Sequence, residues 1–268
     1  MELSAALTTA QHIALQTGAY LRARYQEPIT QTTKSTDIDI VTDADEAAEA
    51  FISRELLRHY PDHHLVGEEG GGQGTPADQA DFHWYIDPID GTTNFASKIP
   101  HFCVSLALTT PGREPLLGVI YDPMRDELFS AVKGEGATLN GTPIQVTDTT
   151  TLVQSVLASG FPYYKHTDPD NNTDQWTAFV KQVRGIRRMG SAALDLAYVA
   201  CGRFDGYWEQ GLKPWDGLAG ILLVAEAGGQ ISDYTGGITP QHDERGRYIA
   251  SNGHIHDAIV ETLTATYS

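Results

Sequence analysis

Two carboxylates three residues apart, Asp87 and Asp90, form the centre of the candidate chemistry, within the segment DPIDGTTNF. The apolar run that ends at Ile86 predicts a strand, which would deliver Asp87 to the rim of a sheet. Pro88 fixes one φ angle and turns the chain, so that Asp90 can point back to the same place. Together with the Ile89 carbonyl between them, these carboxylates are hard oxygen ligands that suit Mg²⁺.

The next three residues, Gly91-Thr92-Thr93, offer backbone N–H groups and hydroxyls to an anion. If a helical turn begins there, its positive end faces that anion. Metal ligands that lead directly into an anion-binding turn suit the hydrolysis of a phosphate ester. A polar Asx turn with a helix cap is the alternative, because Asp, Pro, Gly and Thr are all common turn residues.

Glu68 and Glu69 follow a predicted strand over residues 64–67. Neighbouring side chains of an extended chain point to opposite faces, so we expect only one of the two to reach a given metal directly. An acidic start to a loop is the alternative, and it suits a chain as acidic as this one.

Three more aspartates stand at predicted helix starts. Asp43 and Asp45 come directly after Thr42, where a helix cap or capping box explains them, and we favour that role for Asp43. Asp216 begins an apolar helical run after Trp215. An N-cap role for Asp216 is compatible with metal binding, since a capping carboxylate is held rigidly.

The hydrophobic pattern predicts the elements that must position these residues. Helices are expected over the first 25 residues, 43–60, 174–183, 191–201 and 216–227 and from Ile255, and strands over 64–67, 83–86, 102–109, 116–121, 127–132 and 153–159 and near Ile186, Ile231 and Tyr248. Residues 27–40 are expected to form a loop or hairpin, and Asn140-Gly141 is a hairpin signal. Polar residues 147–151 predict a join between an α+β half, residues 1–150, and an α/β half, residues 151–268.

Two other segments resemble known motifs only in part. The glycine run over residues 70–74 lacks the ending of a P-loop, and we expect a loop. Residues 168–174 resemble the start of a calcium loop, but Thr173 and Phe179 stand where that motif needs Gly and Glu. We therefore expect a solvated loop there.

The composition limits the classes of partner. The chain has 268 residues and a formal net charge of −17, which argues against binding nucleic acid or an anionic membrane surface. Its longest apolar run, residues 218–225, is too short to span a bilayer. The start shows no signal peptide, and Cys103 and Cys201 lack the pattern of a disulfide framework. We expect a cytoplasmic protein.

Four blocks of the sequence resemble the inositol monophosphatase family of Mg²⁺-dependent, lithium-sensitive phosphatases. The blocks are residues 34–45 (KSTDIDIVTDAD), 67–69 (GEE), 87–95 (DPIDGTTNF) and 215–216 (WD) with the downstream Gly220 and 226–229 (EAGG). The combination of DPIDGTTNF with a downstream WD is highly specific, and residues 187–229 are similar to the bacterial branch. The resemblance implies a homodimer and a five-layer αβαβα sandwich, of the type shared with fructose-1,6-bisphosphatase, that combines α+β and α/β halves.

The resemblance also implies a set of metal ligands. Glu68, Asp87 and the carbonyl of Ile89 would bind a first Mg²⁺. Asp87, Asp90 and Asp216 would bind a second, and Glu68 would contribute to a weaker third. Two or three ions per site are therefore expected.

Other residues match the family's catalytic and substrate positions. The matches at Asp45 and Thr92 imply that these two residues, together with Glu68, orient and activate the attacking water. The remaining matches are Gly91, Thr92 and Thr93 for phosphate, Glu209, Gly190, Ser191 and Ala192 for the substrate hydroxyls, and Lys34 for a mobile loop over the site. Lys213 departs from members that carry His at that position, beside the pocket.

The function expected from the resemblance is hydrolysis of myo-inositol monophosphate, a small phosphate ester, by metal-activated water. Alternatives within the same chemistry are histidinol phosphate, fructose 1,6-bisphosphate and 3'-phosphoadenosine 5'-phosphate. Glu209 favours a polyol, because a carboxylate accepts hydrogen bonds from several hydroxyls, although it could also attract the amine of histidinol phosphate. An alternative of another class is a regulatory or scaffold protein with little catalysis.

Overall fold

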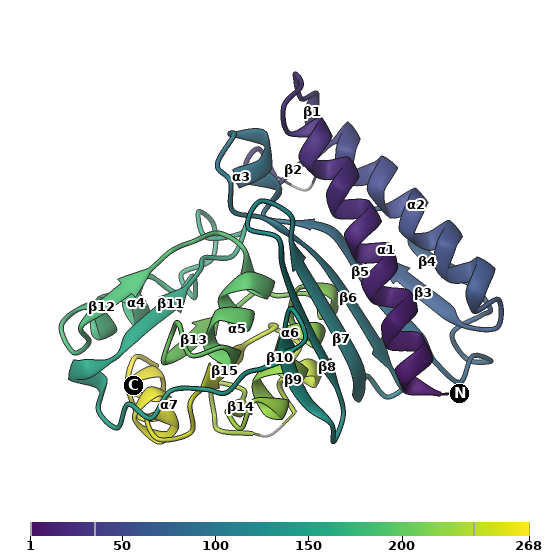
Figure 1. The fold of residues 1–268 in the computed structure, drawn as a ribbon. Helices are drawn as coiled ribbons and strands as arrows, with labels where there is room; N and C mark the ends of the chain where they lie inside the picture. Colours follow the sequence, from purple (N-terminus) through teal and green to yellow (C-terminus); the bar gives the residue numbers. More distant parts are fainter. Residues whose placement is uncertain (1, 35, 238, 268) are drawn as a thin grey trace.

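The chain folds into five layers, visible edge-on in Figure 1. The computed structural model describes residues 2–34, 36–237 and 239–267. In order, the layers are α1 (Leu3–Arg24) with α2 (Asp43–His59), an eight-stranded sheet, α5 (Ala192–Ala200) with α6 (Pro214–Glu226), a five-stranded sheet, and α4 (Thr173–Val180) with α7 (His256–Ala265). This is the predicted αβαβα sandwich.

The eight-stranded sheet is antiparallel except at one pair. Its order is β10 (Thr142–Pro143), β9 (Gly136–Leu139), β8 (Glu127–Val132), β7 (Pro115–Asp122), β6 (Cys103–Thr109), β5 (His83–Asp90), β3 (His64–Gly67) and β4 (Gly71–Gly74). Only β3 and β5 run parallel. The carboxyl ends of these two strands therefore meet at one edge, which brings Glu68 beside the end of β5.

The five-stranded sheet positions the other side of the site. Its order is β12 (Gly185–Arg187), β11 (Val156–Ser159), β13 (Gly206–Glu209), β15 (Tyr248–Ser251) and β14 (Gln230–Ser232). Strand β11 runs parallel to both β12 and β13. Gly160 and Glu209 consequently lie at the same edge of this sheet.

Two hairpins predicted from the sequence are present. Strand β1 (Gln31–Thr33) pairs antiparallel with β2 (Ile40–Thr42), so the polar segment is a hairpin. Asn140 and Gly141 connect β9 to β10 with φ angles of 50° and 77°. Positive φ at both residues is what a tight two-residue hairpin turn requires.

The prediction of a loop over residues 70–74 was wrong, because Gly71–Gly74 pair with β3 as strand β4. Glycine has a low strand propensity, but the neighbouring strand supplies the ladder of backbone hydrogen bonds. The strand predicted from Val153 begins only at Val156, since residues 152–154 form a short 3₁₀ turn.

The predicted loop is present over residues 168–172, before α4 begins at Thr173, but it is not solvated throughout. Asn172 is fully buried; its amide donates to Ser159 Oγ at 2.9 Å and accepts from Trp208 Nε1 at 2.8 Å. Asp170 pairs with Arg245 at 2.7 Å. Because distant residues satisfy these polar groups, the segment is fixed against the five-stranded sheet.

Gly118 lets helix α6 approach strand β7 closely. A Cβ atom at Gly118 would lie 2.8 Å from the Ala219 carbonyl oxygen and 3.0 Å from the Ala219 Cα. We expect Gly118→Ala to lower the free energy of unfolding by about 1–3 kcal/mol, because two backbones would have to separate. The control is Gly112→Ala, where the nearest atom is Thr110 Oγ1 at 3.7 Å. Equal midpoints of denaturant unfolding for the two variants would contradict this account.

Candidate active site

The first carboxylates come from the parallel pair of strands. The Glu68 N–H donates to the Ile86 carbonyl at 3.2 Å, which fixes Glu68 at the end of β5. The register between β5 and β6 shifts between Asp87 and Asp90, so the strand is irregular there and continues through Asp90 instead of ending at Ile86. Asp87 Oδ1 accepts the Ile89 N–H at 3.0 Å, which closes this local turn. Asp87 and Asp90 are both buried.

Asp90 joins the eight-stranded sheet to helix α5. Its carboxylate accepts the Ser191 hydroxyl at 2.7 Å and the N–H groups of Ala192 at 3.2 Å and Ala193 at 2.6 Å. These donors lie at the start of α5, where backbone N–H groups lack partners within the helix. Asp90 thus neutralises the N-terminus of a helix from the other half of the chain.

Asp216 lies in the first turn of α6. The helix begins at Pro214, so Asp216 is its third residue, and the alternative of an N-cap role for Asp216 was wrong. Its Oδ2 accepts the N–H of Lys213, the residue at the N-cap, at 2.6 Å. The carboxylate is therefore held rigidly by the same helix end that it stabilises.

A cavity of about 480 Å³ brings the predicted residues together, and all of them except Asp45 line its wall. Burial raises the pKa of Asp87 and of Asp216 well above the usual range, and the charges of Glu68 and Asp90 raise both further. Burial also raises the pKa of Asp90, to about 6. Such mutual repulsion is relieved when a cation binds among the carboxylates.

Lys34 reaches this cluster from the segment that links β1 to β2. Its Nζ lies 2.8 Å from Glu68 Oε1 and 2.5 Å from Glu69 Oε1. Glu68 and Glu69 lie in a turn, so the premise that they follow one another in extended chain was wrong. Although burial lowers the pKa of Lys34, the two glutamates raise it above its usual value.

Asp45 lies behind the cavity wall and contacts Thr92. The Thr92 hydroxyl lies 3.2 Å from Asp45 Oδ1 and 3.0 Å from the carbonyl oxygen of Ile89. Asp45 Oδ2 accepts the Thr42 N–H at 2.8 Å, and burial raises the pKa of Asp45 to about 6. Thr42 is the N-cap of α2 and Asp45 closes the capping box, so the capping role predicted for Asp43 was wrong. The Asp43 side chain instead pairs with an arginine of α1.

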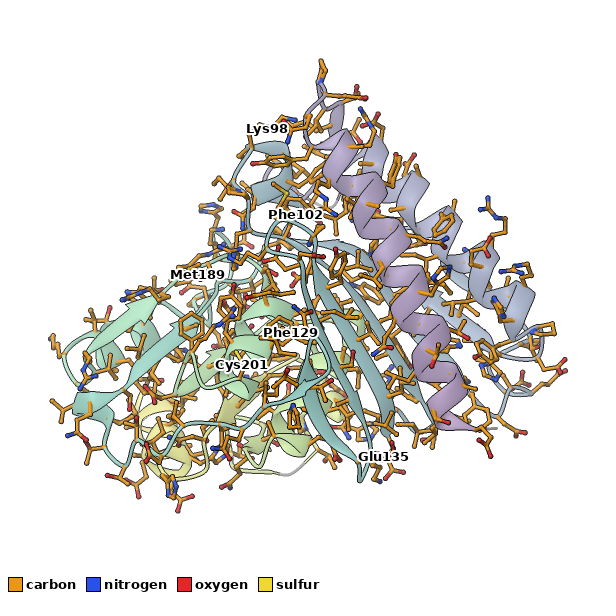
Figure 2. The ribbon with its side chains drawn as sticks, viewed as in Figure 1. Lys98, Phe102, Phe129, Glu135, Met189 and Cys201 are labelled. Carbon is orange, nitrogen blue, oxygen red and sulfur yellow. The ribbon has the colours of Figure 1, made fainter. Side chains whose placement is uncertain are left out.

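The turn at Gly91 needs glycine. Its φ is 100°, and a Cβ there would lie 3.1 Å from the His101 carbonyl oxygen and 3.2 Å from that of Gly190. Asn94 holds these segments together, because its Nδ2 donates to the carbonyls of His101 at 2.8 Å and Met189 at 2.9 Å. Figure 2 labels Met189 in the part of the molecule that carries the smaller sheet.

Glu209 lines the same cavity from the end of β13. Its Oε2 accepts the Tyr207 hydroxyl at 2.6 Å. A Cβ at Gly160 would collide with this carboxylate, so the glycine makes room for it. Burial raises the pKa of Glu209 to about 7.

Comparison with known proteins assigns the chain to a family. The sequence model described as the inositol monophosphatase family matches residues 2–267. The chain belongs to the inositol monophosphatase family. It is 47% identical over 230 residues to a Synechocystis protein named inositol-1-monophosphatase, which covers 85% of this chain and 78% of the relative.

Two further comparisons give one relative with another name and one solved structure. The Nus factor SuhB of Pseudomonas aeruginosa is 44% identical over 227 residues, 84% of this chain and 83% of the relative. The solved structure of an inositol monophosphatase from Anabaena has a TM-score of 0.89 at 43% identity, covering 99% of this chain and 97% of that one.

This family consists of metal-dependent phosphatases, and the site residues fit a hard divalent cation because the donors are carboxylates and a carbonyl oxygen. As the side chains stand, no group of three His, Cys, Asp or Glu residues among residues 2–34, 36–237 and 239–267 is arranged to hold an ion. Glu68 contacts the Lys34 ammonium instead. In this arrangement Lys34 occupies one of the two carboxylate oxygens of Glu68, Oε1.

One residue that shapes the acidic part of the cavity, Glu49, was not predicted from the sequence. Glu49 of α2 is buried, and it accepts the N–H groups of Glu69 at 2.8 Å and Gly70 at 2.5 Å. It thereby fixes the turn that carries Glu68. Its position four residues after Asp45, on the same helix face, was the available signal.

None of the described helices is long and apolar enough to cross a membrane.

Proposed function

We propose that this protein is a Mg²⁺-dependent phosphomonoesterase that hydrolyses myo-inositol monophosphate to inositol and phosphate. The observation that carries the proposal is a single cavity that holds Glu68, Asp87, Asp90 and Asp216 together with Glu209. The first four suit a cation and an attached phosphate, and Glu209 suits the hydroxyls of a polyol. The name of the Synechocystis relative supports the same substrate.

In this proposal the predicted residues keep the tasks that the family resemblance implies. Two or three bound Mg²⁺ ions would lower the pKa of a water molecule and neutralise phosphate charge. Asp45 and Thr92, which lie in contact, would orient and activate the attacking water together with Glu68. Phosphate oxygens would accept hydrogen bonds from Gly91, Thr92 and Thr93.

The segment Gly190-Ser191-Ala192 would shape the pocket for the alcohol. The Ser191 hydroxyl and the Ala192 N–H already donate to Asp90, so their first task is to position that ligand. Glu209 remains the group that would accept hydrogen bonds from substrate hydroxyls.

The proposal is tested by phosphate release from myo-inositol 1-phosphate, histidinol phosphate, fructose 1,6-bisphosphate and 3'-phosphoadenosine 5'-phosphate. Each ester is incubated with Mg²⁺, with EDTA and with Li⁺. We expect inositol phosphate to be preferred, and its hydrolysis to be lost in EDTA and suppressed by Li⁺. Preference for another ester would keep the chemistry and overturn the substrate.

A second candidate is a regulatory or scaffold role, which is favoured by relatives that carry the name Nus factor SuhB. Well-folded protein that hydrolyses none of the four esters would support it. A homodimer and a cytoplasmic location complete the proposal. Light scattering after size-exclusion chromatography tests the first, and cell fractionation tests the second.

Glu209 predicts a pH dependence of substrate binding. Burial raises its pKa to about 7, so it gains its charge as the pH rises through 7. Hydrogen bonds to a charged acceptor are stronger, and KM for inositol 1-phosphate is expected to fall about fivefold between pH 6 and pH 8. Glu209→Gln should remove this fall, while any part due to the titrating substrate persists. The same pH dependence in both proteins would contradict the role of Glu209.

A further inference from the structure

One wall of the cavity is built by the wall segment, residues 160–172, which joins β11 to α4. Four of its side chains line the cavity, those of Phe161, Pro162, Tyr163 and Lys165. Residues 160–172 all belong to the described part of the chain and contain no helix or strand. The position of this wall is therefore set by its contacts with other parts of the molecule.

Asp170 ties the wall segment to the C-terminal part of the chain. Its Oδ2 lies 2.7 Å from Arg245 Nη1 and 3.1 Å from Arg247 Nη2, and its Oδ1 accepts the Tyr267 hydroxyl at 2.9 Å. Although burial raises the pKa of Asp170, hydrogen bonds from Tyr267 and Arg247 hold it below its usual value. Asp170 is thus an ionised carboxylate that binds donors from three residues.

The Tyr267 hydroxyl also reaches the chain beside Glu209. Gln210 follows Glu209, is fully buried and lines the cavity. Its Nε2 donates to the carbonyl oxygen of Asp170 at 2.6 Å, and its Oε1 accepts from the Tyr267 hydroxyl at 3.4 Å. Tyr267, Asp170 and Gln210 therefore form a closed ring of contacts that joins the wall segment to the end of β13.

The ring of Tyr267 is held independently of its hydroxyl. Tyr267 lies two residues beyond the end of α7, and its N–H donates to the Thr264 carbonyl at 3.2 Å. The Arg247 guanidinium lies 5.4 Å from the centre of the ring, a favourable cation–π arrangement. Removing the hydroxyl alone therefore leaves the ring in place.

We propose that Tyr267 is a positioning residue for the cavity, whose hydroxyl acts through Asp170 and Gln210 to keep the wall segment in the position that binds substrate. The proposal rests on the proposed phosphatase function. A wall that is fixed before the substrate arrives lowers the entropic penalty of binding. The carboxylates Asp90 and Asp216 are held by helix ends, so the hydroxyl should affect substrate binding and leave the chemical step unaltered.

Tyr267→Phe is the first test, with KM and kcat measured on the ester that the protein hydrolyses best. KM is expected to rise about fivefold and kcat to stay within about twofold, because only a bond that supports binding is lost. Tyr60→Phe is the matched control. The Tyr60 hydroxyl donates to Thr9 Oγ1 at 3.2 Å in the layer of α1 and α2, and neither residue lines the cavity. This control should keep both constants.

A double-mutant cycle tests the route through Asp170. When Asp170→Ala is already present, Tyr267→Phe should raise KM by less than about twofold further, because the shared partner is absent. The full fivefold rise in the double variant would overturn this route. An unchanged KM in Tyr267→Phe, or a fall in kcat without a change in KM, would overturn the positioning role.

Amide hydrogen exchange separates this proposal from the proposed function, because it needs no substrate. In Tyr267→Phe, residues 161–172 are expected to exchange at least about threefold faster than in the unaltered protein, and in Tyr60→Phe at the same rate. If the protein hydrolyses none of the esters, this faster exchange would support the positioning role while the phosphatase proposal fails. A change confined to α7, or no change, would overturn the positioning role, since Tyr267 would then serve only its own helix.

Discussion

Asp90→Asn is expected to lower the rate of phosphate release in Mg²⁺ at least about 100-fold, while the protein still folds. Loss of a partner that merely orients a metal ligand costs about 10–100-fold, so loss of a ligand itself should cost no less. The substitution also replaces charge-assisted hydrogen bonds from Ser191 and Ala193 by weaker ones. We therefore expect a loss of about 1–3 kcal/mol in the free energy of unfolding, which leaves the fold intact.

Asp205→Asn is the matched control for this experiment. Asp205 is also buried and also accepts bonds from distant segments, from the Val156 N–H at 2.6 Å and the Thr147 hydroxyl at 2.7 Å. It does not line the cavity. We expect a similar loss of stability with full turnover. Retained turnover in Asp90→Asn, or equal inactivation of both variants, would refute the assignment of Asp90 as a metal ligand.

Removal of divalent cations by EDTA is expected to abolish turnover and to lower the thermal unfolding midpoint more at pH 8 than at pH 5. Burial raises the pKa of Asp87 and Asp216, and raises that of Asp45 and Asp90 to about 6. A carboxyl whose pKa is higher in the folded than in the unfolded state favours folding while it is protonated. This contribution to the free energy of unfolding is lost as the pH rises from the unfolded-state pKa through the folded-state pKa.

The free energy of unfolding of the metal-free protein should therefore fall between about pH 4 and the raised pKa values. Each carboxyl contributes about 1.4 kcal/mol for each unit by which its folded-state pKa exceeds its unfolded-state pKa. Bound Mg²⁺ would offset the ionised carboxylates and remove most of this slope. Thermal unfolding at pH 5, 6, 7 and 8 measures both curves. Asp195→Asn should keep the difference between them, because Asp195 is buried outside the cavity wall. Parallel curves with and without Mg²⁺ would contradict the account.

The elements that depend on local sequence were predictable. Helix α2 begins after the cap at Thr42 and ends before Pro61, as the sequence pattern predicted. Asp87 and Asp90 could be recognised as partners because one short segment carries both, with Pro88 between them. The hairpin at Asn140-Gly141 was equally predictable, since both residue types readily adopt the positive φ angles of its turn.

Features that depend on distant partners were not predictable. Asn172 lies in a polar stretch that predicts an exposed loop. Its side-chain oxygen instead accepts a hydrogen bond from Trp208, 36 positions later, and the residue is fully buried. Strand β4 contains three glycines and exists because β3 lies beside it. Lys165 and Arg188 belong to segments that are separate in the sequence, and only the packing of the five-stranded sheet brings them to one cavity.

The bond between Asp90 and Ala193 spans 103 positions of the chain, and this separation bears on how the protein folds. All strands of the large sheet precede α5 and α6 in the sequence, so a growing chain holds Glu68, Asp87 and Asp90 before their partners have been synthesised. Contacts of such long range slow folding, because the loop-closure entropy is lost before the contact is gained. The cation site proposed above would thus be completed only when the segment that carries α5 and α6 docks against the large sheet.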